Sequence, residues 1–337
     1  MKTVVVTGGL GFIGSNLINT LSKKKYFIIN IDKINYASNH NNILSKIKNY
    51  KFFKQDINFQ KSIKNILEIY NPSIVFNLAA ESHVDRSIDN PQKFIQSNFL
   101  GTYNLLEVIR KFKKKIRFIH VSTDEVFGDI KKNKKSKEID AYNPSSPYAA
   151  SKACADLLIK AYIRTYKINA IITNCCNNYG PNQYPEKFIP TIIHSIIYKK
   201  PIPIYGSGKN SREWIYVQDH CNALIKISEK GISGENYNIG SGVELNNNDL
   251  VQRIILLFKK IDRELYNNVK LIYVKDRPGH DLRYSLNSSK IKRSLNWRCR
   301  YNFEEGLKNT ILWYIEKFNK KNFFINKDFK KRIGLKT

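Results

Sequence analysis

Three glycines near the start of the chain constrain the fold more than any other feature. Gly8, Gly11 and Gly14 follow a β-rich run at residues 2–7 and precede a helical pattern at residues 15–22. Glycines let the backbone turn tightly between strand and helix and approach a pyrophosphate, which then lies at the N-terminus of the helix. A purely structural turn is the alternative. The order of strand, turn and helix favours a dinucleotide-binding site.

Further strand-like runs alternate with helical patterns as far as residue 180. The strands are expected at residues 26–31, 50–55, 73–80, 116–121 and 170–174, and two long helices at residues 91–110 and 147–166. Such alternation is typical of an α/β protein with a doubly wound parallel sheet of the Rossmann type.

The regular pattern ends at residues 177–181, where glycine and proline follow two asparagines. We therefore expect a dinucleotide-binding Rossmann domain at residues 1–180 and a smaller C-terminal α/β substrate domain at residues 181–337. Residues 213–240 carry strand and helix signals, and we expect them to return to the sheet of the first domain.

The acids that end the second and third strands predict the choice of cofactor. Asp32 would accept hydrogen bonds from the adenosine ribose and repel a 2′-phosphate, which favours NAD over NADP. Lys33, directly after it, weakens that preference. Asp56 is interpreted either as a contact to the adenine or as an ordinary turn residue.

Composition excludes several classes of function. The 337-residue chain has a formal net charge of +29, but its lysines are scattered and no nucleic-acid motif accompanies them, so we expect an anionic small substrate and no nucleic acid. Five cysteines without a C-x-x-C pair favour a reducing, cytoplasmic location and no zinc site. His83 and Asp85 lack further partners for a metal. No apolar run approaches the roughly 20 residues of a membrane helix, and the initial strand leaves no room for a signal peptide.

A hydroxyl pair and two acids follow the expected fifth strand. Ser122, Thr123, Asp124 and Glu125 would lie at its carboxyl end, where open α/β sheets bind their ligands. The alternative is a capping box, because Ser122 and Glu125 have the required spacing. A cap should open a long helix, whereas this segment runs into Gly128 and a lysine-rich loop. A catalytic role is therefore favoured.

Tyr148 and Lys152 lie four positions apart at the start of the expected helix at residues 147–166, and hence on one helical face. A nearby ammonium group lowers the pKa of a tyrosine and makes its phenolate a competent base. The spacing alone carries little weight in a chain rich in tyrosine and lysine, but this pair follows directly on the acidic strand end.

Taken together, these motifs resemble those of the extended short-chain dehydrogenase/reductases, and within them the dTDP-glucose 4,6-dehydratase family very closely. The matching runs cover residues 78–87, 122–126, 146–152, 173–175, 177–181, 185–187, 203–206 and 276–281. The Thr-Asp-Glu triplet and the Arg-Pro-Gly-His-Asp run are the most specific. Phe127 and Cys176 depart from the family's usual tyrosine and serine, at positions that carry no chemistry.

The resemblance implies an NAD-dependent dehydration of a nucleotide sugar. Tyr148, poised by Lys152, would take the proton of the glucose 4-hydroxyl during oxidation at C4, and Thr123 would hydrogen-bond the C4 oxygen. Glu125 would remove the C5 hydrogen, and Asp124 would protonate the departing 6-hydroxyl. Two adjacent carboxyls suit these opposed roles, because like charges push their pKa values apart.

The resemblance also implies the binding residues and a homodimer. Cofactor contacts fall on Gly8, Gly11, Phe12, Ile13, Gly14, Asp32, Lys33, Asp56, Ile57, Leu78, Ala80, Ser97, Tyr148, Lys152 and Asn178. Substrate contacts fall on Ser82, Thr123, Asn177, Glu186, Lys187, Pro203, Tyr205, Arg212, Asn247, Arg277 and His280. Arg212 and Arg277 are expected to bind the diphosphate, since a guanidinium offers a bidentate fork. Subunits would pair through the helices after Pro91 and Pro147.

Two rival functions are less favoured, and two questions stay open. A nucleotide-sugar 4-epimerase or decarboxylase on the same scaffold would lack the Asp-Glu pair, so Asp124 favours dehydration. A regulatory protein that only senses NAD would lack Tyr148, Lys152 or the acids. The choice between thymine and uracil in the substrate stays open, as does a second role for the basic charge or for the lysine-rich tail at residues 318–337.

Overall fold

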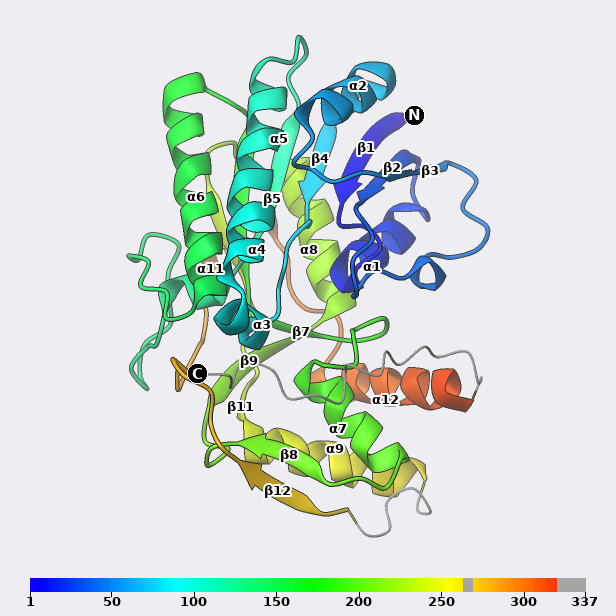
Figure 1. The fold of residues 1–337 in the computed structure, drawn as a ribbon, viewed down its shortest axis with the longest axis vertical. Coiled ribbons are helices and arrows are strands. Elements are labelled where there is room, and N and C mark those ends of the chain that lie inside the picture. Colours follow the sequence, from blue (N-terminus) through cyan, green and yellow to red (C-terminus); the bar gives the residue numbers. More distant parts are fainter. Residues whose placement is uncertain (263–268, 320–337) are drawn as a thin grey trace.

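The computed structural model describes residues 1–262 and 269–319, so nearly all of the lysine-rich tail lies outside the described residues. Its largest element is a seven-stranded parallel sheet in the order β10-β6-β5-β4-β1-β2-β3 (Figure 1). The strands are β1 (Lys2–Thr7), β2 (Tyr26–Asp32), β3 (Tyr50–Lys54), β4 (Ile74–Asn77), β5 (Arg117–Thr123), β6 (Ala170–Cys175) and β10 (Asn236–Ile239). Strand order reverses between β1 and β4, which confirms the predicted doubly wound Rossmann-type sheet.

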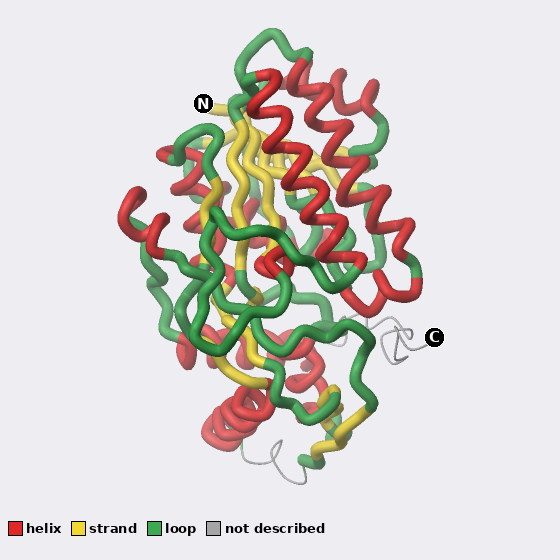
Figure 2. The backbone as a smooth tube through the Cα atoms, turned by 90° about the vertical axis from the view of Figure 1, so that its left-hand side faces the viewer, coloured by secondary structure: helices red, strands yellow, loops and turns green. Residues whose placement is uncertain are grey.

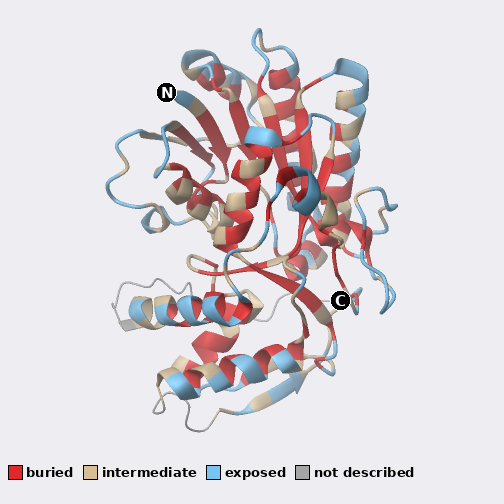
Figure 3. Ribbon diagram, turned by 180° about the vertical axis from the view of Figure 1, so that it is seen from behind, coloured by how far each residue is buried: buried red, intermediate tan, exposed pale blue. Residues whose placement is uncertain are grey.

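Helices cover both faces of this sheet, so its strands are buried between two apolar layers (Figures 2 and 3). One face carries α1 (Phe12–Leu21), α8 (Val217–Lys230) and α11 (Ser289–Leu295). The other carries α2 (Gln60–Tyr70), α5 (Gly101–Arg110) and α6 (Pro147–Tyr166). Burial on both faces explains why the strands read as continuous apolar runs.

The helix expected at residues 91–110 is present as one continuous helical run. It begins as α4 (Pro91–Phe94), passes through a π-helical segment (Ile95–Leu100) and ends as α5. Proline at the first helical position costs nothing, because that backbone nitrogen has no partner within the helix. A short helix, α3 (Val84–Asp89), precedes this run.

The C-terminal half has a separate core. A three-stranded sheet has the order β11-β9-β7 and a two-stranded sheet pairs β12 with β8. These strands are β7 (Asn177–Tyr179), β8 (Ile202–Tyr205), β9 (Ser211–Tyr216), β11 (Glu244–Asn246) and β12 (Leu271–Val274), with helices α7 (Phe188–Ile197), α9 (Asn247–Ile261) and α12 (Phe303–Asn319). Apolar residues of these helices and strands form one cluster.

The segment at residues 213–240 is divided between the two sheets: its first residues belong to β9 of the three-stranded sheet, whereas β10 is an edge strand of the large sheet. Strand β10 pairs with β6 in parallel, and α8 packs against α1. Helix α11 also packs against β10 and α8, so the chain crosses between the two halves more often than the sequence pattern indicates. The division into domains at residue 180 stays a prediction.

The glycine turn is shaped by close backbone contacts. Gly8 has a φ of +68°, and a Cβ there would stand 2.8 Å from the backbone of Ala79 on the strand end of β4. A Cβ on Gly14 would stand 2.3 Å from the carbonyl oxygen of Gly8. Only glycine fits at either position, and the close backbone packing that results holds the turn at the N-terminus of α1.

Candidate functional site

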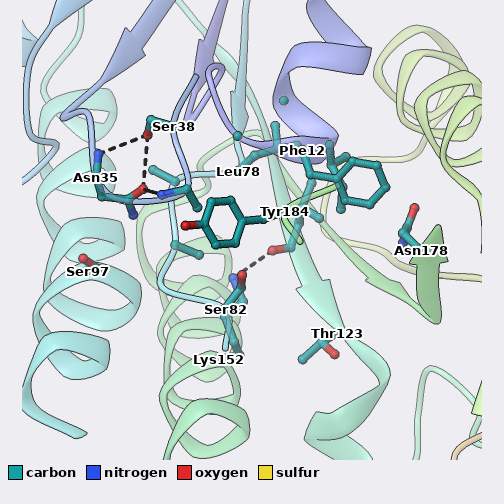
Figure 4. Close-up of a pocket in the computed structure, with 18 of the residues that line it drawn as sticks. Phe12, Asn35, Ser38, Leu78, Ser82, Ser97, Thr123, Lys152, Asn178 and Tyr184 are labelled. Atoms are coloured by element: carbon teal, nitrogen blue, oxygen red, sulfur yellow. Dashed lines mark hydrogen bonds between the residues drawn. The ribbon is translucent and has the colours of Figure 1, made fainter. Parts of the chain in front are cut away.

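One pocket lies at the carboxyl ends of the large sheet, next to the point where strand order reverses (Figure 4). This is the edge where open α/β sheets bind ligands. Every residue expected to contact the cofactor or to act in catalysis lines it: Gly8, Gly11, Phe12, Ile13, Gly14, Asp32, Lys33, Asp56, Ile57, Leu78, Ala80, Ser97, Thr123, Asp124, Glu125, Tyr148, Lys152 and Asn178. Their roles remain predictions, but the geometry brings them together.

The expected substrate residues divide into two groups. Ser82, Thr123, Asn177, Glu186 and Lys187 line the same pocket. Pro203, Tyr205, Arg212, Asn247, Arg277 and His280 do not appear in its lining and come from β8, β9, α9 and the loop after β12. Arg277 and Arg212 nevertheless act electrostatically on Glu125, so these two members of the second group lie near the acids.

Asp32 and Lys33 are held in place by hydrogen bonds at the end of β2. The carboxylate of Asp32 accepts hydrogen bonds from Leu10 N at 3.0 Å and from Ile34 N at 2.8 Å. The ammonium of Lys33 donates to Ser97 Oγ at 2.8 Å and lies 3.3 Å from a carboxylate oxygen of Glu81. Because Glu81 balances the charge of Lys33, the acid at position 32 dominates this end of the pocket.

The two acids after β5 are placed by a single 3-10 turn, Asp124–Phe127. Thr123 Oγ1 donates to Asp124 Oδ1 at 3.1 Å, and the buried Asp124 Oδ2 has no hydrogen-bond partner among the described residues. Burial, reinforced by Glu125, raises the pKa of Asp124 well above its ordinary value. Burial also raises the pKa of Glu125, but Arg277 and Arg212 oppose that rise. The geometry therefore favours a neutral Asp124 beside a more acidic Glu125.

The capping-box alternative for this stretch is wrong. Ser122 still belongs to β5, and its hydroxyl donates to Asp156 Oδ2 at 2.7 Å. The cap of the turn is Thr123, whose hydroxyl accepts from Glu125 N at 3.3 Å. The turn ends at Gly128, where φ is +70°, and no long helix follows.

Tyr148 and Lys152 lie in the first turns of α6, where the Ser146 hydroxyl caps the helix. Burial, together with Glu125, raises the pKa of Tyr148 well above its ordinary value, while a hydrogen bond with Thr123 opposes the rise. Burial lowers the pKa of Lys152 to about 8. The pKa of Tyr148 is thus raised and not lowered as expected from Lys152, because desolvation acts in the opposite direction and more strongly.

Two polar residues near Lys152, His120 and Asp156, are not among those predicted from the sequence. Lys152 Nζ donates to Val121 O at 2.8 Å and lies 3.1 Å from His120 Nε2. His120 in turn lies 3.5 Å from Asp156, whose pKa burial raises to about 6. His120 faces the same side of β5 as Ser122, and Asp156 stands one helical turn after Lys152, so both could have been found by extending the strand and helix periodicity.

The loop after β2 was also missed. Asn35, Tyr36, Ser38 and, from further along the chain, Tyr184 line the pocket (Figure 4). No local pattern marks these residues. Their position follows from contacts between segments about 150 residues apart, such as the hydrogen bond from Tyr36 Oη to Glu186 at 2.9 Å.

Two classes of site are absent from the described part of the chain. Residues 1–262 and 269–319 contain no group of three or more histidine, cysteine, aspartate or glutamate side chains that could hold a metal ion. No described helix is both long and apolar enough to cross a membrane.

Comparison with known proteins identifies the family. The model of the GDP-mannose 4,6 dehydratase family matches residues 5–310. A dTDP-glucose 4,6-dehydratase of Haemophilus influenzae is 45% identical over 94% of this chain and 98% of its own length. The chain belongs to the dTDP-glucose 4,6-dehydratase family.

Solved structures agree on the fold of this dehydratase family member. A dTDP-glucose 4,6-dehydratase of Streptomyces venezuelae, solved with NAD bound, has a TM-score of 0.87 at 38% identity, covering 94% of this chain and 98% of its own. A UDP-glucose 4-epimerase of Thermotoga maritima has a TM-score of 0.86 at 28% identity, covering 94% and 99%. Because both activities share the scaffold, the side chains of the pocket must distinguish them.

The geometry at Asp32 leads to a prediction about the cofactor. We expect the purified protein to release NAD rather than NADP on denaturation, identified by mass. The variant Lys33→Ala should release the same cofactor, because the ammonium of Lys33 is already bonded to Ser97 and Glu81. Recovery of mainly NADP from either protein would show that Asp32 does not govern the choice.

Proposed function

We propose that the chain is an NAD-dependent dTDP-glucose 4,6-dehydratase that forms dTDP-4-keto-6-deoxyglucose for deoxysugar biosynthesis. The observation that carries the proposal is the placement of Thr123, Asp124 and Glu125 beside Tyr148 in one pocket. An epimerase needs the tyrosine but has no use for the pair of acids.

The raised pKa of Asp124 supports its role as the acid of the elimination. A buried carboxyl that keeps its proton can give it to the departing 6-hydroxyl, and its unpartnered Oδ2 is the atom from which the proton would leave. Two guanidinium groups partly offset the rise in the pKa of Glu125, so its carboxylate can accept the C5 hydrogen as a proton. The hydroxyl of Thr123 lies between Asp124 and Tyr148, where it can bind the C4 oxygen.

The residues present fit the proposed cofactor. The turn at Gly8, Gly11 and Gly14 lines the pocket at the N-terminus of α1, where a pyrophosphate would bind, and Asp32 would meet the adenosine ribose. When bound, NAD supplies reversible oxidation at C4 and a positive charge on its ring. Lys152 Nζ donates to Val121 O. Its ammonium group would bind the second ribose of NAD and would favour the ionised form of Tyr148.

The proposal is tested by the fate of a label. Purified protein is incubated with dTDP-glucose or UDP-glucose, each deuterated at C4, and the product is analysed by mass spectrometry and NMR. We expect a 4-keto-6-deoxy sugar with deuterium at C6 and one solvent-derived hydrogen at C5, without added oxidant. Comparison of the two nucleotides measures the preference for thymine or uracil. A product that keeps its 6-hydroxyl and carries the label at C4 would establish an epimerase instead.

The role of Asp124 gives a second prediction. Asp124→Asn should slow elimination about 10²–10⁴-fold, because an amide is a far weaker acid toward the leaving hydroxyl, while oxidation at C4 persists. Single-turnover measurements should therefore show reduced nicotinamide accumulating. Equal losses in both steps would mean that Asp124 is structural.

The pH profile checks the same assignment in the unmodified protein. Elimination needs a protonated Asp124 and an ionised Glu125, so its rate should fall at low pH as Glu125 gains a proton and at high pH as Asp124 loses one. In Asp124→Asn the loss at high pH should disappear from this step.

We also propose a homodimer in the cytoplasm. The helical runs at Pro91–Arg110 and Pro147–Tyr166 pack together and expose Ile95, Leu100 and Leu157, each at least 42% exposed, on their outer side. Unpaired apolar side chains on adjacent helices suit contact with a second copy. All five cysteines are free, which fits a reducing compartment.

The dimer is tested by sedimentation. Leu157→Lys should convert it to a folded monomer, since burying a charge in an apolar interface is unfavourable. Ile139→Lys, at an 89% exposed position away from these helices, is the matched control and should leave the mass unchanged. A wild-type protein that sediments as a monomer would contradict the proposal.

A further inference from the structure

Asp85, in the first turn of α3, joins two distant segments of the C-terminal half. Its Oδ1 accepts a hydrogen bond from Arg277 Nη1 at 3.0 Å, and its Oδ2 accepts from Tyr205 Oη at 2.9 Å. Asp85 itself is 4% exposed. Helix α3 lies where the large sheet meets the smaller half (Figure 1), so one carboxylate connects the two.

The neighbours of Asp85 make similar connections. Ser82 O accepts a hydrogen bond from Lys187 Nζ at 2.7 Å. Arg86 donates to Glu186 Oε2 through Nε at 3.1 Å and Nη2 at 2.9 Å. The segment at residues 82–86 therefore contacts every one of these three substrate-side segments, around residues 186, 205 and 277.

Asp85 and Arg277 form an ion pair in which each group stabilises the charge of the other. Burial alone would raise the pKa of Asp85, but Arg277 and His83 outweigh it and lower the pKa. Burial would likewise lower the pKa of Arg277, but Asp85 and Glu125 outweigh it and raise the pKa. Both groups stay ionised near neutral pH. Removing one member of such a buried pair leaves an uncompensated charge that must move or be solvated.

The ion pair with Asp85 occupies only part of the Arg277 guanidinium group. Its Nη1 is bonded to Asp85, while its Nε is buried and has no hydrogen-bond partner among the described residues. A buried guanidinium donor without a partner is costly, and an anionic oxygen would satisfy it. The orientation that presents this donor is set by Asp85.

We propose that Asp85 is a positioning residue that fixes Arg277 and Tyr205 for binding the diphosphate of the substrate. This rests on the proposed function only in naming the ligand as a nucleoside diphosphate. Asp85 is buried and does not line the pocket; it acts through the two side chains that it holds.

Two effects of opposite sign separate this role from a purely electrostatic one. Deleting the negative charge of Asp85 would strengthen binding of an anion if position did not matter. An asparagine in its place would present one acceptor and one amide donor, so either Arg277 faces a donor or the hydrogen bond with Tyr205 reverses, and in both cases the ion pair that orients Arg277 is lost. A misplacement of about 1 Å can lower a reaction rate on the order of 10²-fold. We therefore expect the loss of position to outweigh the gain from removing a negative charge.

The test measures binding of dTDP by calorimetry together with steady-state turnover. Asp85→Asn should weaken dTDP binding about 10–100-fold and raise KM for dTDP-glucose more than it lowers kcat. Tyr205→Phe, which leaves the charge pair intact, should cause a smaller loss of the same sign. Glu304→Gln breaks an exposed pair with Arg253 at 2.9 Å in the same half and should change neither quantity.

Each outcome decides the matter. Unchanged or tighter dTDP binding by a folded Asp85→Asn overturns the proposal, and if that variant does not fold, unchanged binding by Tyr205→Phe overturns it. A wild-type protein that binds dTDP but does not dehydrate dTDP-glucose refutes the proposed activity and leaves the role of Asp85 standing. A wild-type protein that does not bind dTDP refutes both.

Discussion

The site depends on the desolvation of two adjacent carboxyls at the end of β5. Asp124 and Glu125 are withdrawn from water, which raises the pKa of both. Arg277 and Arg212 make the two pKa values unequal, because their charges oppose the rise more strongly at Glu125. Those guanidinium groups come from the C-terminal half and are themselves held, Arg277 by Asp85 and Arg212 by carbonyl oxygens such as that of Asp281. The protonation of the site is therefore a consequence of how the two halves pack.

Much of the large sheet could be predicted because its information is local. Apolar runs, the spacing of Gly8, Gly11 and Gly14, and the polar residues at strand ends each occupy a few consecutive positions. Parallel strands bring their carboxyl ends to one edge, so residues as far apart as Asp32 and Tyr148 could be assigned to one pocket without knowledge of their contacts. Errors at strand and helix ends were a few residues, as for α1, which begins at Phe12 rather than Ser15.

What could not be predicted depends on contacts between distant segments or on burial. The hydrogen bonds of Asp85 span 120 and 192 positions, and although Tyr205 and Arg277 lie in recognisable motifs, no local pattern pairs Asp85 with either of them. The pKa of Tyr148 was expected to fall from the spacing to Lys152 alone, yet burial raises it, and burial is a property of the whole fold. The alternative of a capping box at Ser122 is wrong for a similar reason. Buried Asp156 needs a hydrogen-bond donor, and the Ser122 hydroxyl donates to it and not to the turn.

The scaffold by itself is neutral between reactions, since an epimerase and a dehydratase superpose on it equally well. Both reactions need a tyrosine beside a nicotinamide, and Tyr148 lines the pocket that we propose for NAD. Elimination needs in addition a proton donor that survives at neutral pH, which water-exposed carboxyls cannot supply. Burying Asp124 creates that donor, but an unsolvated acid pair destabilises the fold unless nearby cations offset it. Under the proposed function, the arginines that offset it would also bind the anionic substrate. On that proposal, the same two guanidinium groups would therefore offset the acid pair and bind the diphosphate, and buried contacts such as that between Arg277 and Asp85 hold them in place.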